Sequence, residues 1–144
     1  MNIKKILIAV DASDFSLKAA KKAIEFSKTF KSEVSVVFVL ETIKPVTTAE
    51  LGYMAVDVVE KARAEAGDIL AKLSDETNTK FDQVIPEGNP WEVIIETAKS
   101  IGADMITLST HGRTGLMHLL LGSVAESVVQ HSPVPVLIYP AKCL

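Results

Sequence analysis

The segment Ala103 to Pro140, ADMITLSTHGRTGLMHLLLGSVAESVVQHSPVPVLIYP, decides the fold, because it contains a complete strand–loop–helix–strand unit. Residues 103–109 and 134–140 are largely apolar runs of strand length, as in strands that are buried on both faces. Residues 123–132 are predicted to form a helix between them. Two strands joined through a helix predict a parallel pair with a right-handed crossover.

The same alternation extends back to the N-terminus. Further strands are predicted at residues 4–11, 33–41 and 81–88, and further helices at residues 16–30, 49–73 and 89–102. The helix at 89–102 is clearly bounded, because Asn89 can cap it, Pro90 suits its first position and Gly102 can close it. Gly52 and Gly67 weaken the helix prediction at 49–73, where a break would be compatible with the sequence.

Strands and helices therefore alternate along the whole chain. This order predicts an α/β fold with a five-stranded parallel sheet, helices on both faces, and one domain over residues 1–144. In such sheets ligands bind outside the carboxyl ends of the strands, where the strand order reverses. The loops that follow the strands are therefore where a binding site is expected.

Composition excludes several classes of protein. The 144 residues carry a formal net charge of −3 and no long basic block, which argues against a nucleic-acid partner. Nothing approaches the ~20 consecutive apolar residues of a membrane span. The single cysteine, Cys143, rules out a disulfide within the chain and favours a reducing compartment, so a cytoplasmic location is expected.

The loop between the strand at 103–109 and the helix at 123–132 is unusually long, at about a dozen residues where two to six are usual. Gly112, Gly115 and Gly122 let the backbone approach a ligand closely. Ser123 begins a helix, whose N-terminal N–H groups and dipole favour an anion. Arg113 could pair with a phosphate. These features favour a phosphate site, although two turns and a capping box of Ser123 with Glu126 would also explain the glycines and the serine.

The first strand leads into the loop VDASDFS, where Asp11 stands at the strand end. Ser13 or Asp14 can cap the helix that follows. Asp11 lies several residues before the helical pattern, so a ligand-facing role and a capping role both stay open for it. The chain has neither G-x-G-x-x-G nor G-x-x-x-x-G-K-[ST], which argues against a dinucleotide fingerprint and a P-loop.

Two blocks, ILIAVDASDFSLKAAKKAIEFSK and EGNPWEVIIETAKSIGADMITLSTHGRTGLMHLLLGSVAESVVQHSPVPVLIYP, resemble the universal stress protein family over essentially the whole chain. In the ATP-binding branch of that family the long loop reads G-x2-G-x9-G-[ST]. Gly112, nine intervening residues and then Gly122 and Ser123 fit this motif, while Ser109 stands where the motif begins with glycine. The resemblance implies a Rossmann-like sheet whose first and fourth strands are neighbours.

The resemblance also implies a binding site for ATP. Ala9, Val10 and Asp11 would line its adenine and ribose end, and Val39 would meet adenine through its backbone. Phosphates would be held by Gly112, Gly122, Ser123 and Val124, with Ser109 facing the ribose or the α-phosphate. Mg²⁺ or Mn²⁺ would bind mainly through phosphate oxygens.

The family commonly forms dimers through its last strand, which here contains Val134, Val136 and Ile138. An apolar strand at a sheet edge would otherwise be exposed. Together these points predict a cytoplasmic, homodimeric sensor or regulator that binds ATP, with no dedicated catalytic residues. Two alternatives are a dimeric interaction protein of the same fold without nucleotide, and a slow ATP-hydrolysing or self-phosphorylating enzyme of a related α/β family.

Overall fold

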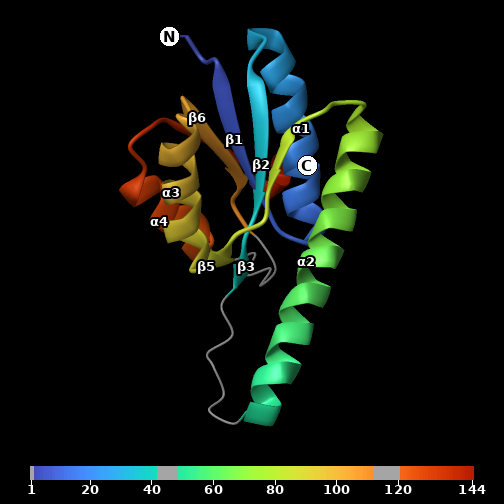
Figure 1. Cartoon of the computed structure of the whole chain (residues 1–144). Coiled ribbons are helices and arrows are strands. Elements are labelled where there is room, and N and C mark those ends of the chain that lie inside the picture. The colour runs from blue at the N-terminus through green and yellow to red at the C-terminus, as the bar shows by residue number, and fades with distance from the viewer. Residues whose placement is uncertain (1, 42–48, 112–120) are drawn as a thin grey trace.

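The computed structural model describes residues 2–41, 49–111 and 121–144, with the backbone alone for residues 49–55. Strands and helices alternate along the chain (Figure 1). The strands are β1 (Lys5–Val10), β2 (Glu33–Phe38), β3 (Leu40–Glu41), β4 (Asp82–Val84), β5 (Glu87–Gly88), β6 (Met105–Ser109) and β7 (Val136–Tyr139). The helices are α1 (Asp14–Phe30), α2 (Ala49–Thr77), α3 (Pro90–Ile101), α4 (Ser123–His131) and the short 3-10 helix η1 (Ala141–Cys143). Within the described ranges, no helix combines the length and apolar character needed to cross a membrane.

Five of the strands form one sheet in the order β4-β2-β1-β6-β7. All four neighbouring pairs are parallel, which confirms the predicted five-stranded parallel sheet. From β1 the chain moves outward through β2 to β4, and from β6 it moves in the opposite direction to β7. The strand order therefore reverses between β1 and β6, and the carboxyl ends of these two strands lie side by side.

Helices cover both faces of this sheet, as predicted, with α1 and α2 on one face and α3 and α4 on the other (Figure 1). β1 contributes side chains to the hydrophobic cores on both faces of the sheet, because successive side chains of a strand point to opposite faces. Ile6 and Ile8 pack with Leu70 of α2, whereas Leu7 packs with Val128 of α4. All five side chains are almost completely buried. Burial on both faces explains why the central strands are continuous apolar runs.

Two of the predicted strands are interrupted. The run at 33–41 divides into β2 and β3, and the run at 81–88 divides into β4 and β5. β3 and β5 form a separate two-stranded parallel sheet in which Glu41 lies opposite Gly88. Pro86 lies just before β5, and proline has no N–H to donate to a sheet ladder. The pairing of the main sheet therefore stops before it, and a second short pairing begins after it.

The first and third helices end where the sequence predicts, and α1 begins at Asp14, two residues before the predicted start at residue 16. Ser13 caps α1, and its Oγ accepts a hydrogen bond from the N–H of Ser16 at 3.2 Å. Asn89 occupies the N-cap position of α3 with Pro90 as the first helical residue, but the Asn89 side chain makes no capping hydrogen bond. Gly102 closes α3 in the left-handed conformation with φ 67°.

The other two helices differ from their predictions. α2 continues to Thr77, beyond the predicted end at residue 73, and it does not break at Gly67. α4 begins at Ser123 as predicted, but its N-cap is Gly122. The interpretation of Ser123 and Glu126 as a capping box is therefore wrong, because the serine already lies inside the first helical turn.

Candidate ligand pocket at the strand switch point

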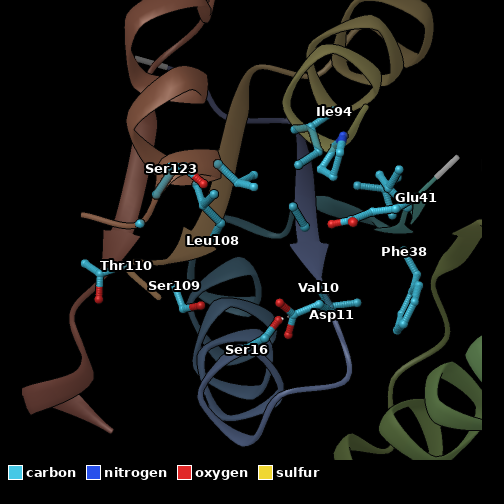
Figure 2. Close-up of a pocket in the computed structure, with 17 residues that line it drawn as sticks. Val10, Asp11, Ser16, Phe38, Glu41, Ile94, Leu108, Ser109, Thr110 and Ser123 are labelled. Carbon is cyan, nitrogen blue, oxygen red and sulfur yellow. Dashed lines mark hydrogen bonds between the residues drawn. The ribbon is translucent and has the colours of Figure 1, made fainter. Parts of the chain in front are cut away.

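A cavity of about 180 Å³, called here the switch-point pocket, lies at the carboxyl ends of β2, β1 and β6 (Figure 2). It occupies the position that doubly wound sheets use for ligands. The described residues that line it are Ala9, Val10, Asp11, Ser16, Val37, Phe38, Val39, Glu41, Pro90, Ile94, Leu108, Ser109, Thr110, Gly122, Ser123, Val124 and Ala125.

The loop after β1 holds Asp11 in a defined position. Its Oδ1 accepts a hydrogen bond from the N–H of Ser13 at 2.8 Å, and its own N–H donates to Ser16 Oγ at 2.8 Å. Because Ser13 is the N-cap, Asp11 does not cap α1. Figure 2 shows the Asp11 carboxylate next to Ser16 at the edge of the pocket. The carboxylate is therefore oriented by the start of α1 before any ligand arrives.

The loop after β6 begins in a network of short hydrogen bonds. Ser109 is buried, and its Oγ donates to the carbonyl oxygen of His111 at 2.7 Å. Thr110 Oγ1 lies 2.9 Å from His111 Nδ1. The N–H of Gly122 donates to the carbonyl of Thr110 at 2.6 Å, which joins the two ends of the loop. A Cβ on Gly122 would lie 3.0 Å from that carbonyl oxygen, so the glycine permits this close approach.

The first turn of α4 faces the pocket. Ser123, Val124 and Ala125 all line it, and the N–H of Glu126 donates to the carbonyl of Gly122 at 2.9 Å as the first bond of the helix. The N–H groups of the three residues before Glu126 have no carbonyl partner within the helix. Together with the positive end of the helix dipole, they form an anion-binding end.

Tyr139 lies opposite Ser109 in the register of β6 and β7. Burial raises the pKa of the Tyr139 phenol above its ordinary value, and the negative charge of Glu25 raises it further. The phenol therefore stays neutral at physiological pH, and it packs against the core on the α1 and α2 face of the sheet.

The described lining is acidic. Asp11 and Glu41 are its only charged side chains, and both are carboxylates. Among the described lining residues, which include no lysine or arginine, the α4 N-terminus is the feature that favours an anionic group. Arg113, the cation predicted for the long loop, lies outside the described residues together with Gly112 and Gly115.

Most of the residues singled out from the sequence meet at this one pocket. Those that line it are Ala9, Val10, Asp11, Val39, Ser109, Gly122, Ser123 and Val124. Sequence reasoning missed Ser16, Glu41, Thr110, Pro90 and Ile94. The sequence contains a signal for Glu41, since this residue ends the predicted strand at 33–41 and ligands of such sheets bind at strand ends. Pro90 and Ile94 had no such signal, because α3 reaches the pocket only through the packing of helices on the sheet.

The fold and the pocket define the class of protein: a doubly wound α/β protein with a pocket at the switch point of the sheet. The sequence model of the Universal stress protein family matches residues 2–140. The chain belongs to the universal stress protein family.

Individual relatives agree with this assignment. Universal stress protein MJ0531 of Methanocaldococcus jannaschii is 37% identical over 137 residues, which cover 94% of this chain and 81% of that protein. The solved structure of MJ0577 from the same organism superposes with a TM-score of 0.80 at 30% identity, covering 97% of each chain. A universal stress protein solved in complex with cAMP superposes with a TM-score of 0.72, covering 97% of this chain and 98% of that one, and its 20% identity shows the fold alone.

Proposed function

We propose that this chain binds an adenine nucleotide, ATP accompanied by Mg²⁺ or Mn²⁺, in the switch-point pocket. On this proposal it is a cytoplasmic sensor or regulator of the stress response rather than a dedicated enzyme. The cAMP complex of a protein with the same fold agrees with an adenine ligand. The remaining support for the proposal comes from the residues that line the pocket in this chain.

The main support for the proposal is that three different chemical environments follow one another along the pocket. The carboxyl end of β2 gives an apolar wall with Val37 and Val39. The carboxyl end of β1 gives the Asp11 carboxylate, and the far side gives the N-terminus of α4. A base with apolar ring faces, a sugar with hydroxyl donors and a phosphate chain present the complementary groups in the same order.

The pocket fits the phosphates better than it fits a bare metal ion. The close contact of Gly122 with Thr110 leaves little room for a side chain at the start of α4, and the glycine keeps the backbone accessible there. Among the described residues, no group of three or more His, Cys, Asp or Glu could hold a metal. We therefore expect Mg²⁺ or Mn²⁺ to arrive with the nucleotide and to be bound mainly by phosphate oxygens.

Calorimetry on protein stripped of nucleotide tests this function. We expect saturable binding of ATP with Mg²⁺, one per chain, and weaker binding when EDTA removes the metal, because the carboxylates of Asp11 and Glu41 repel unneutralised phosphates. Mass spectrometry of nucleotide that co-purifies with the protein gives an independent readout. Absence of saturable heat at millimolar ATP with Mg²⁺ would refute the proposal.

We also propose that the chain forms a homodimer through β7, the outer strand of the sheet next to β6. The carbonyls of Pro135 and Tyr139 accept hydrogen bonds from Ile106 of β6 and from Thr110 just after it. By the alternation of a strand, the backbone groups of Val136 and Ile138 therefore face the open edge. The apolar side chains of Val134, Val136 and Ile138 lie next to this edge. A second copy of the strand could therefore pair with it.

Replacing Ile138 with proline is expected to convert the dimer into a monomer without unfolding the chain. Proline removes an N–H that faces outward, while the hydrogen bonds from Ile106 to Pro135 and from Thr110 to Tyr139 remain. Multi-angle light scattering across a concentration series measures the change. Ile138→Ala is the matched control, since it shortens the same side chain and keeps the N–H. A dimer that persists in Ile138→Pro would place the interface elsewhere.

A further inference from the structure

Glu41 is a carboxylate at the end of the switch-point pocket farthest from the α4 N-terminus. Figure 2 shows Ser123 and Thr110 on one side of the pocket, Glu41 and Phe38 on the other, and Asp11 between the two sides. This order follows the sheet, because β2, β1 and β6 are consecutive strands. In the same view the Glu41 side chain points into the pocket.

The second small sheet fixes the backbone of Glu41. Glu41 is paired with Gly88 in the β3–β5 ladder, and the N–H of the preceding Leu40 donates to the carbonyl of Pro86 at 2.8 Å. The neighbouring Glu87 is engaged by Arg63 at 2.9 Å, so that carboxylate is already paired. Glu41 shows no such ion pair within the described part of the chain. Its backbone is thus held in place while its carboxylate faces the pocket.

The orientation of a bound nucleotide decides what this carboxylate meets. With the phosphates at the α4 N-terminus and the sugar at Asp11, the base lies against Val39 and Ile94. In a purine, the edge of the six-membered ring lies away from the bond to the sugar, so this edge turns toward Glu41. An ionised carboxylate has acceptors only, and it therefore selects a base edge that presents N–H donors.

We propose that Glu41 is a specificity-determining residue that accepts a hydrogen bond from the exocyclic amino group of adenine. This inference rests on the proposed function, since it assumes that an adenine nucleotide occupies the pocket. It adds a side-chain contact that distinguishes an amino group on the base from hydrogen at the same position. The removal of Glu41 is expected to change the discrimination between bases, and not only the affinity.

The test compares two ligands that differ in one group. Calorimetry with Mg²⁺ present measures Kd for ATP and for purine riboside triphosphate, which carries hydrogen in place of the amino group and has the same charge. The wild-type chain is expected to bind ATP about tenfold more tightly, as one charge-assisted hydrogen bond from an exposed side chain allows. In Glu41→Met, which keeps the length of the side chain but has no oxygen, the ratio of the two Kd values is expected to fall to about one.

Two further variants separate this contact from general effects. Glu41→Gln keeps an oxygen acceptor and is expected to retain part of the discrimination. Glu92→Met removes a carboxylate from the first turn of α3, outside the lining of the pocket, and is expected to leave the ratio unchanged. A ratio in Glu41→Met equal to that of the wild-type chain would overturn this inference while leaving nucleotide binding intact. No saturable binding of ATP to the wild-type chain would instead show that the proposed function fails.

Discussion

Gly122→Val is expected to weaken ATP binding by about a hundredfold or more while the chain remains folded. A Cβ at this position would lie 3.0 Å from the carbonyl oxygen of Thr110, and that neighbour is backbone that cannot rotate away. The branched side chain must therefore push the start of α4 away from the loop after β6. This movement disturbs the 2.6 Å hydrogen bond from Gly122 to Thr110 and the N–H groups of Ser123 and Val124 behind it.

Calorimetry measures the affinity, and circular dichroism with thermal unfolding measures the fold. The stability cost is expected to be about 1–2 kcal/mol, because valine is also a poor N-cap residue. Gly122→Ala gives a graded comparison, since it adds the same Cβ without branches and is expected to lose about tenfold in affinity. If Gly122→Val binds ATP as tightly as the wild-type chain, the phosphates do not lie at the α4 N-terminus.

Gly88→Ala is expected to lower the free energy of unfolding by about 2–4 kcal/mol. Gly88 has φ 144°, a conformation that residues with a Cβ rarely adopt, and a Cβ there would lie 2.6 Å from Cγ2 of Val93. The β-branched valine has little freedom to turn aside within α3. Two costs therefore act together at this position, backbone strain and steric overlap. Denaturant unfolding followed by circular dichroism measures their sum.

Two comparisons separate these costs. Gly102→Ala places alanine at another positive φ, 67°, where a Cβ meets nothing within 4 Å, and it is expected to cost only about 1 kcal/mol. In a Val93→Ala background the overlap disappears, so Gly88→Ala is expected to cost about 1–2 kcal/mol less than in the wild-type chain. Equal costs in the two backgrounds would show that overlap with Val93 contributes nothing.

Gly88 also connects the small β3–β5 sheet with two parts of the pocket lining. It pairs with Glu41 and directly precedes Asn89, the N-cap of the helix that brings Pro90 and Ile94 to the pocket. A disturbance at Gly88 would therefore displace one wall of the pocket and the carboxylate at its end. For this reason we expect Gly88→Ala to impair ATP binding as well as stability.

Local sequence features predict part of this site. Asp11 ends an apolar run and Ser123 begins a helix, and these signals depend only on neighbouring residues. Only the resemblance to the family predicts Ser109, Ala9, Val10, Val39 and Val124. Gly122 was recognised from the spacing of the loop. Its role as the N-cap does not follow from the sequence, because the hydrogen bond to Thr110 closes a loop of eleven intervening residues and no local pattern encodes it.

By itself, the sequence determined the alternation of strands and helices, the parallel sheet buried on both faces, and the loops in which ligand-binding groups would lie. Those features follow from periodicity and chain connectivity, which are local properties. The tertiary structure alone decided that β3 and β5 leave the main sheet and pair with each other, although 46 positions separate Glu41 from Gly88. That pairing depends on the packing of α3, because Val93 of α3 leaves no space for a side chain at Gly88. It is the reason why Glu41 faces the pocket rather than extending the strand before it.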